Sequence, residues 1–343
     1  MSIDPNTYKR VHESVGFFDA SRTFGRVFAK GKDAIDLLHR MSTNDLKPLE
    51  AAPGMVSVTM LTNEKGRIVD VLTVVRDDAG DVLLITSAGR EEAVVQWLDK
   101  FTIMEDARFV PATNQTAQFA LIGPKAGALL ANYTTIDLDL MPELSVIGIT
   151  AAGAQATIFK SEHIAGSGWW ILTSSENAKA TREELEAQTL AAGGAIISDE
   201  LYELLRIESG IPKAPNELNE KHNPLETLLM QTAVSFTKGC YIGQEVIARL
   251  DAQGKVQRKL VGLRFVDGAP SVGERISDPS ITGVAPLGDE IGDVTSVAVS
   301  PAFGAIGLGY VRAKHANPGG VVSVKDASGT TISATIVTLP FET

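Results

Sequence analysis

The stretch TFGRVFAKGKDAIDLLHRM, residues 23–41, contains two hydrophobic patterns in direct succession. Residues 23–29 predict a β-strand, whereas residues 32–41 carry apolar side chains at the spacing of an α-helix. A strand that leads at once into a helix favours a mixed fold in which helices cover a sheet.

The residues that follow continue this alternation. Residues 56–61 and 67–76 predict a hairpin around the turn at 62–66, and residues 82–86 predict a buried strand. Residues 90–101 then form an amphipathic helical pattern. The order strand, helix, hairpin, strand, helix predicts an α+β sandwich.

A similar set recurs between residues 117 and 192. Its predicted strands are 119–123, 154–160 and 168–173, and its predicted helices begin at Pro124 and span 178–192. A further helix is expected from Asp199 through Arg206, with Asp199 as its N-terminal cap. The chain therefore contains two α+β units in its first 254 residues.

From Lys255 onward, short β-rich runs alternate with Gly, Pro and Asp turns, which predicts a small antiparallel barrel. We place a domain boundary near residue 254. Residues 1–254 form the predicted N-terminal region, with lobes of about 1–116 and 117–254 that can interleave, and residues 255–343 form the barrel.

Bulk composition excludes several classes of protein. The formal net charge of −11 argues against an extended surface for nucleic acid, although a local basic patch is compatible with it. No apolar run approaches the roughly 20 residues that span a bilayer. The N-terminal residues lack the pattern of a signal or transit peptide. We expect a cytoplasmic protein that neither enters a membrane nor binds nucleic acid directly.

Residues 238–249, KGCYIGQEVIAR, contain the only cysteine of the chain, Cys240. One cysteine excludes an intramolecular disulfide and any cysteine-only metal site within one chain. Cys240 is expected in a turn ahead of a helix that begins after Gly243, and both Lys238 and the helix N-terminus would lower the pKa of its thiol. Glu245 and Arg249 are spaced for an ion pair.

Two other interpretations of Cys240 remain open. The first, with about equal weight, makes it a small buried hydrophobic residue. The second is a Cys–His hydrolase, which would require His222 to approach through tertiary contact.

The octamer KGCYIGQE resembles the signature of the YgfZ-type folate-binding family, whose members are relatives of the aminomethyltransferase (T protein) of the glycine cleavage system. The resemblance extends along nearly the whole chain. The matching segments are 17–46, 62–74 (TNEKGRIVDVLTV), 205–212 (LRIESGIP), 216–226 (NELNEKHNPLE) and 300–311 (SPAFGAIGLGYV).

This resemblance implies a three-lobed, aminomethyltransferase-like fold. Two α+β lobes and a C-terminal antiparallel barrel would surround a central channel for the cofactor. That cofactor would be tetrahydrofolate or a 5- or 10-substituted derivative.

The resemblance also assigns roles to two residues. Asp70 matches the aspartate that faces the reactive folate nitrogen, and Arg206 matches an arginine of the family. Each has a structural alternative. Asp70 could be an exposed strand residue balancing Arg67, and Arg206 could be a buried cation paired with Glu203 or Glu208.

Two positions depart from the aminomethyltransferase pattern. The glutamate that holds the pterin is missing from residues 164–169 (IAGSGW), and the expected asparagine is Thr86 here. Glycine-cleavage activity is therefore expected to be absent. Folate binding would rely on channel shape and on stacking with Trp169 or Trp170, although adjacent strand tryptophans are also typical of a core.

The preferred function that the resemblance implies is a tetrahydrofolate-binding accessory protein. It would support assembly or repair of client iron–sulfur enzymes, including tRNA-modifying ones, with Cys240 as its functional thiol. The catalytic candidates are Cys240 and Asp70. The cofactor-binding candidates are Asp70, Thr86, Trp169, Arg206, Lys238, Tyr241, Gln244, Glu245 and Arg249.

Two alternative functions stay open. One is a folate-dependent aminomethyltransferase or other one-carbon transferase acting through Asp70. The other is a protein-binding module that keeps the fold without the chemistry. The expected partners are folate and client iron–sulfur proteins, no metal site is expected, and we expect a monomer.

Overall fold

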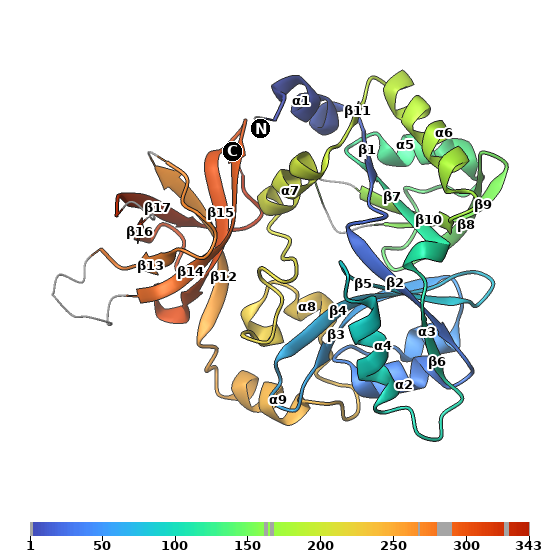
Figure 1. Ribbon diagram of the computed structural model, residues 1–343, viewed down its shortest axis with the longest axis horizontal. Coiled ribbons are helices and arrows are strands. Elements are labelled where there is room, and N and C mark those ends of the chain that lie inside the picture. Colours follow the sequence, from blue (N-terminus) through green and yellow to red (C-terminus); the bar gives the residue numbers. More distant parts are fainter. Residues whose placement is uncertain are drawn as a thin grey trace. The chain divides into compact units, whose positions relative to one another are not determined.

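The computed structural model describes residues 3–160, 164, 168–266, 268–279, 290–325 and 329–342 (Figure 1). The chain forms two compact units. The first unit contains residues 1–198 and 231–245, and the second contains residues 199–230 and 246–343.

An antiparallel five-stranded sheet lies in the first unit, with the order β3-β4-β5-β2-β6. Its strands are β2 (Phe24–Lys30), β3 (Met55–Thr62), β4 (Ile68–Arg76), β5 (Val82–Ser87) and β6 (Arg108–Pro111). Its helices are α2 (Ala34–Met41), α3 (Lys47–Ala51) and α4 (Glu91–Asp99). Buried residues of these helices, such as Leu37 and Val94, share one hydrophobic cluster with Leu72 and Leu84 of the sheet.

The second sheet of this unit has six strands in the order β11-β1-β7-β10-β9-β8. They are β1 (Gly16–Asp19), β7 (Thr116–Ile122), β8 (Val146–Ala151), β9 (Ala154–Lys160), β10 (Gly168–Ser174) and β11 (Ala195–Ile196). The accompanying helices are α1 (Pro5–Glu13), α5 (Ala126–Leu130) and α6 (Ala178–Ala191). Because β1 precedes β2 in sequence but pairs with β7, the chain crosses between the two sheets.

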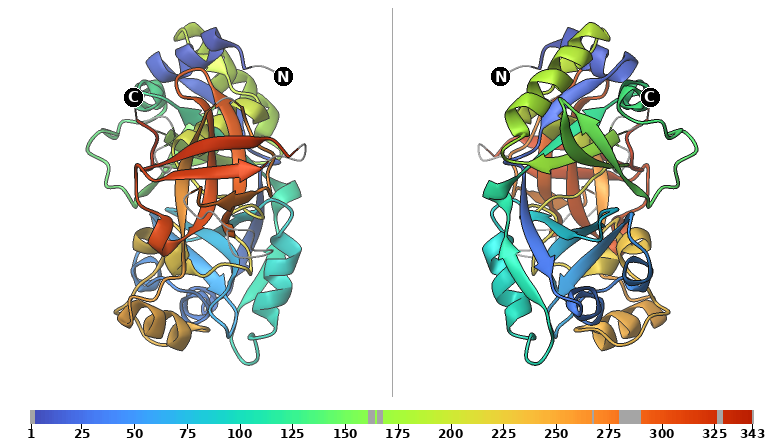
Figure 2. Two further views of the ribbon diagram at one scale, coloured as in Figure 1. Left: turned by 90° about the vertical axis from the view of Figure 1, so that its left-hand side faces the viewer. Right: turned by 90° about the vertical axis from the view of Figure 1, so that its right-hand side faces the viewer.

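An apolar layer joins the two sheets. Val56, Val75 and Ile85 of the five-stranded sheet form one buried cluster with Phe159 and Leu172 of the six-stranded sheet. On their other faces, the five-stranded sheet shares a buried cluster with α2, α3 and α4, and the six-stranded sheet shares one with α5 and α6. Figure 2 gives two further views of the chain. The predicted α+β sandwich is confirmed.

The second unit contains a closed antiparallel barrel of order β12-β15-β14-β13-β16-β17. Its strands are β12 (Arg258–Val266), β13 (Arg275–Ser277), β14 (Glu290–Ser300), β15 (Gly304–Arg312), β16 (Val321–Lys325) and β17 (Thr331–Val337). Helix α7 (Asp199–Glu208) packs on β14 and β15, so it belongs with the barrel although it precedes it. The barrel itself is confirmed as predicted.

Two more helices and several 3₁₀ turns are found in the described residues. They are α8 (Met230–Ala233), α9 (Gln244–Ala252), and the 3₁₀ turns Thr113–Gln115, Ala131–Tyr133, Pro224–Glu226 and Ala313–His315. Across the described residues, no helix combines the length and apolar character needed to cross a membrane.

Arg26 connects the two sheets at the point where the chain crosses between them. Its side chain has no exposed surface. Its guanidinium donates to the Thr116 Oγ1 at 2.8 Å, the Thr113 carbonyl at 2.8 Å and the Ser21 carbonyl at 3.1 Å. These acceptors belong to the segments that enter β7 and leave β1, so Arg26 holds the crossing together.

Replacement of Arg26 by leucine is expected to destabilise the first unit by about 2–4 kcal/mol, because several buried acceptors lose their donor. Chemical denaturation followed by tryptophan fluorescence measures this effect. All three tryptophans (Trp97, Trp169 and Trp170) lie in the first unit.

The matched control is Arg22→Leu, which changes an exposed arginine on the same connection. Its effect should stay within about 0.5 kcal/mol. Equal stability losses for both variants would show that Arg26 does not join the sheets.

Candidate functional site

Asp70 lies on β4 and is a buried carboxylate, only 2% exposed. Its Oδ1 accepts hydrogen bonds from the Val71 N–H at 2.9 Å and the Ser87 hydroxyl at 2.5 Å. Burial raises the pKa of Asp70, and the hydrogen bonds from Ser87 and Val71 and the charge of Arg90 oppose that rise. The interpretation of Asp70 as an exposed residue balancing Arg67 is therefore wrong.

A β-bulge precedes Asp70. Asp70 is opposite Leu61, but Ile68 is opposite Thr62, so Val69 is an extra residue on β4. The Val69 carbonyl accepts a hydrogen bond from Arg90 Nη2 at 3.1 Å. A bulge bends its strand and redirects the next side chain, a device found next to active sites.

Thr86 lies beside Ser87 at the end of β5 and is 1% exposed. Its hydroxyl donates to the Ser87 carbonyl at 3.0 Å. A Cβ on Gly25 would collide with Thr86 Oγ1 and with Glu91 Oε2, so glycine at position 25 leaves room for both polar groups. The structure thus places Thr86 directly beside Ser87, whose hydroxyl binds Asp70.

Ser87 and Arg90 were missed by the sequence analysis. Both act directly on Asp70, one through its hydroxyl and the other through its charge. Their signal was their position, because Ser87 directly follows the predicted strand that ends at Thr86 and Arg90 begins the predicted helix after it.

Cys240 is exposed, which confirms the predicted accessibility and excludes the buried interpretation. Lys238 does not stabilise the thiolate form of Cys240. The buried Lys238 Nζ donates to the carbonyls of Ser42 at 2.7 Å, Asn44 at 2.8 Å and His39. Because an ammonium group has three donors, none remains for a thiolate or a ligand, and this corrects the predicted role of Lys238.

Burial lowers the pKa of Lys238 to about 8. The group therefore remains charged at neutral pH and donates to three carbonyls, at the end of α2 and in the segment that follows it. Its Nζ also lies 5.3 Å from the centre of the Tyr241 ring. Tyr241 is itself buried, and burial raises its pKa to about 12.

Helix α9 begins at Gln244, directly after Gly243, as predicted. Gln244 is half-buried, whereas Glu245 and Arg249 are exposed. The described residues show no ion pair between Glu245 and Arg249, so that expectation is wrong. An exposed pair at this spacing gains little energy because water screens both charges.

Trp169 lies in a hydrophobic core, and Arg206 lies in a buried hydrogen-bonded network. Trp169 packs in the core of the six-stranded sheet, in agreement with the core interpretation. Arg206 is 2% exposed and belongs to the second unit. Its guanidinium donates to Glu203, to Glu217 Oε2 at 3.1 Å, to Ser296 Oγ at 2.5 Å and to the Ile211 carbonyl.

These contacts use all five N–H donors of Arg206, which leaves none for a cofactor. The predicted pairing with Glu203 is confirmed, whereas Glu208 instead accepts from Ser300. In the stretch that lacks the pterin-binding glutamate, residues 165–167 lie outside the described residues.

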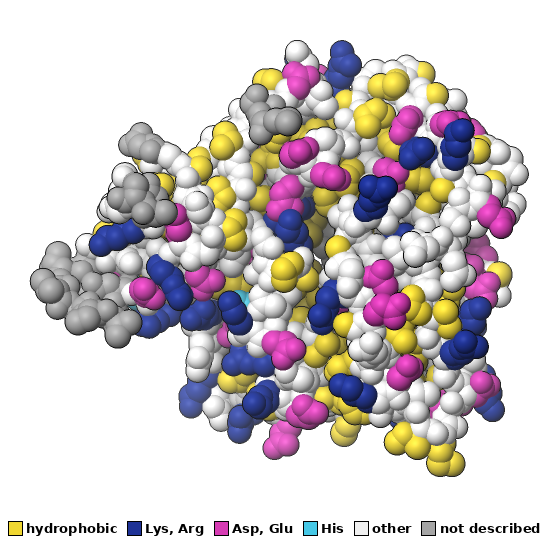
Figure 3. Space-filling view, viewed as in Figure 1, with side chains coloured by type: hydrophobic (Ala, Val, Ile, Leu, Met, Phe, Trp, Pro, Cys, Tyr) yellow, Lys and Arg dark blue, Asp and Glu magenta, His cyan; other side chains and the backbone are white. Residues whose placement is uncertain are grey.

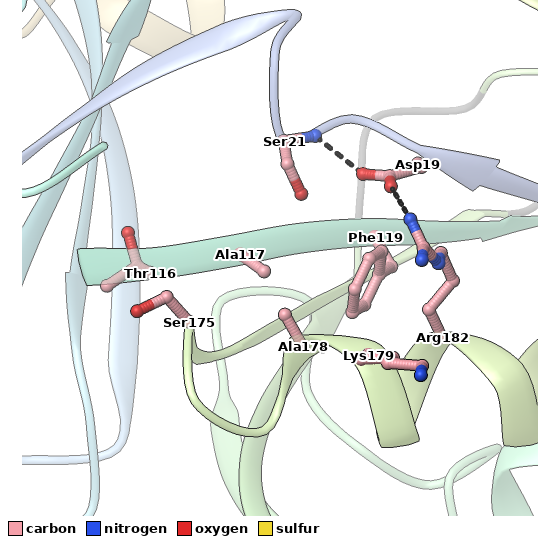
Figure 4. A pocket seen from close by; sticks show the side chains of 9 residues that line it. All are labelled: Asp19, Ser21, Thr116, Ala117, Phe119, Ser175, Ala178, Lys179 and Arg182. Atoms are coloured by element: carbon pink, nitrogen blue, oxygen red, sulfur yellow. Dashed lines mark hydrogen bonds and ion pairs between the residues drawn. The ribbon is translucent and has the colours of Figure 1, made fainter. Parts of the chain in front are cut away.

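A surface pocket of about 310 Å³ lies elsewhere in the first unit (Figure 4). Asp19, Phe119, Lys179 and Arg182 line it, and none of the candidate site residues does. Asp19 forms an ion pair with Arg182 at 3.5 Å. Since Asp19 and Arg182 pair with each other and none of the lining residues is a buried polar one, we place the candidate site at Asp70. Among the described residues, no group of three or more His, Cys, Asp or Glu could hold a metal.

Asp70→Asn is expected to raise the stability of the first unit at pH 7. Because burial raises the folded-state pKa above the ordinary value of 3.8, folding favours the protonated carboxyl. Burial of the ionised Asp70 carboxylate lowers the free energy of unfolding. This loss is complete above the folded-state pKa and fades as the pH falls toward 3.8. The stability gap between the variant and the wild type should therefore shrink over the same interval.

Denaturation followed by tryptophan fluorescence between pH 4 and 8 measures this gap. Asp99→Asn, a change at an exposed residue, serves as the control and should show no such trend. A gap that widens as the pH falls would contradict the prediction.

Comparison with known proteins shows the family to which the chain belongs. The chain matches the GCVT N-terminal domain over residues 5–238 and the glycine cleavage T-protein C-terminal barrel domain over residues 258–342. It is 30% identical to an aminomethyltransferase of Geobacillus kaustophilus, over 99% of this chain and 92% of that protein. It is also 30% identical to an aminomethyltransferase of Symbiobacterium thermophilum, over 97% of this chain and 88% of the relative.

The same fold is found in the crystal structure of glycine cleavage system aminomethyltransferase T from Bartonella henselae. The TM-score is 0.82 at 22% identity, with 98% of this chain and 89% of that chain covered. Both halves of the sequence and the whole fold lead to one conclusion: the chain belongs to the glycine cleavage T-protein family.

Proposed function

We propose that this protein is a folate-dependent one-carbon transferase in which Asp70 acts on tetrahydrofolate or a 5- or 10-substituted derivative. The observation that carries the proposal is the buried carboxyl of Asp70, placed after a bulge and bounded by Ser87 and Arg90. Membership of the T-protein family and relatives named aminomethyltransferase support this reading over a non-enzymatic one.

The surroundings of Asp70 suit an acid–base group. A carboxyl whose pKa is raised by burial holds a proton more readily than a free one, and its ionised form can stabilise positive charge that develops on nitrogen during carbon transfer. Ser87 holds one carboxyl oxygen, so the direction of the group is fixed. Arg90 adds positive charge, which keeps the ionised form accessible.

A turnover assay tests this proposal. The protein is combined with aminomethylated carrier protein and tetrahydrofolate, and methylene-tetrahydrofolate and ammonia are measured. We expect turnover of about 1 per second, a typical enzyme rate. Asp70→Asn should lower it by about 100-fold or more because a positioned proton-transfer group is lost, whereas Asp99→Asn should not.

Absence of turnover would contradict aminomethyl transfer and would agree with the expectation drawn from the altered pterin-binding positions. The folate donor can then be varied in the same assay. If no one-carbon donor or acceptor supports transfer, the transferase proposal fails.

A specific observation favours a second candidate function. Cys240 is exposed in the KGCYIGQE segment, where a thiol is open to reaction with a partner. The alternative is a YgfZ-type, tetrahydrofolate-binding accessory protein for iron–sulfur enzymes, including tRNA-modifying ones. In that case Cys240, rather than Asp70, carries the essential chemistry.

Cys240→Ala separates the two candidates. Because the side chain is exposed, its stability should stay within about 0.5 kcal/mol of the wild type. The transferase reading predicts unchanged turnover, whereas the accessory reading predicts loss of iron–sulfur enzyme activity in a complemented deletion strain. A stable Cys240→Ala protein that complements fully would remove the accessory candidate.

A further inference from the structure

Residues 231–243 are bound to the five-stranded sheet through an intervening segment. Residues 42–44 lie along the edge of β3, where the Thr43 N–H donates to the Met60 carbonyl at 3.0 Å. On its other side, Thr43 Oγ1 donates to the Ala233 carbonyl at 2.6 Å, and the Ser235 N–H donates to the Thr43 carbonyl at 3.0 Å. Residues 42–44 therefore lie between the edge strand β3 and residues 233–235 and are hydrogen-bonded to both.

Lys238 fixes the beginning of the KGCYIGQE segment to the same place. Its ammonium group binds the carbonyls of His39, Ser42 and Asn44. These carbonyls lie at the end of α2 and in the segment that covers β3, so the lysine joins three parts of the first unit.

The end of the segment contacts the turn between β3 and β4. Gly243 has a φ of +84°, and a Cβ there would lie 2.6 Å from the Asn63 carbonyl oxygen and 2.9 Å from the Gly66 Cα. Thr62 Oγ1 donates to the Ile242 carbonyl at 2.5 Å. Close backbone packing and one partly buried hydrogen bond thus hold the segment against the turn.

Thr62 is also the residue at which the strand register changes. Leu61 faces Asp70, Thr62 faces Ile68, and the extra residue Val69 lies between them on β4. Two contacts hold the bulge. On β4, the Val69 carbonyl accepts from Arg90, and on the paired strand β3, Thr62 donates to the Ile242 carbonyl.

We infer that the Lys238–Gly243 segment positions Asp70 by holding this bulge, with Thr62 and Gly243 as positioning residues. The turn does not need the segment for its own shape, because Asn63 Oδ1 already accepts from Lys65 N–H and Arg67 N–H. The segment instead fixes the position of Thr62, through the hydrogen bond from its hydroxyl to the Ile242 carbonyl. The effect of this on folate binding rests on the proposed function.

Two pairs of matched variants test the inference. Thr62→Val removes the hydroxyl at nearly constant volume, whereas Thr62→Ser retains it. Gly243→Ala forces a Cβ into the turn, whereas Gly239→Ala adds the same atom in open space within the same segment. Each variant is made both alone and in combination with Asp70→Asn, and denaturation midpoints are measured from pH 4 to pH 8.

If the segment positions Asp70, loosening the bulge hydrates the carboxyl. The pH-dependent midpoint difference caused by Asp70→Asn should then fall by at least half in Thr62→Val and Gly243→Ala. It should remain in full in Thr62→Ser and Gly239→Ala. Equal pH-dependent differences in all four backgrounds would overturn the inference, because a merely structural role lowers every midpoint without changing this difference.

Binding of 5-formyl-tetrahydrofolate gives a second readout. Thr62→Val and Gly243→Ala should weaken it by about tenfold relative to their matched controls. If the wild type does not bind the ligand, the proposed function fails, but the stability comparison still decides the inference. Normal binding in all variants together with equal pH-dependent differences would reject the positioning role.

Discussion

The burial of one carboxyl group, that of Asp70, is the constraint on which the proposed function of this molecule depends. An ionisable group removed from water costs free energy unless it is hydrogen-bonded or paired. Here Ser87 and the Val71 N–H offset part of that cost, and Arg90 adds a favourable charge. A buried acid whose pKa is shifted by burial and a nearby charge is a candidate for a functional site.

The fold supplies the means to keep that carboxyl in place. The chain crosses between two sheets, Arg26 binds the crossing, and an apolar layer joins the sheet faces. On the surface view, Lys, Arg, Asp and Glu side chains are intermixed over much of the visible face (Figure 3). This face therefore shows no single large patch of one charge, and the proposed chemistry is assigned to a few buried polar groups.

Most of the regular elements could be predicted because their hydrophobic periodicity is local. The hairpin around residues 62–66 and the barrel strands after residue 255 are examples. The sheet to which β1 belongs could not be predicted, since four residues carry no signal for pairing with β7, about a hundred positions later. The central channel that the family resemblance implies remains a prediction.

Candidate site residues could be named only where a family motif or position could be matched. Asp70 and Cys240 were named by their motifs, and Thr86 by its position, where the family has asparagine. The role of Lys238 was not, because its acceptors are backbone carbonyls of residues 39–44 that no sequence motif marks. Arg206 was assigned to a cofactor by resemblance, yet its donors are used by acceptors as distant as Ser296.

Calorimetric titration with tetrahydrofolate under anaerobic conditions tests the central claim most directly. The wild type and Asp70→Leu, an apolar replacement of similar size, are compared at pH 7. We predict saturable binding to the wild type below about 1 mM and at least tenfold weaker binding to the variant, because the ligand loses its buried polar partner. No heat of binding at millimolar ligand, or equal affinity for both proteins, would contradict the account.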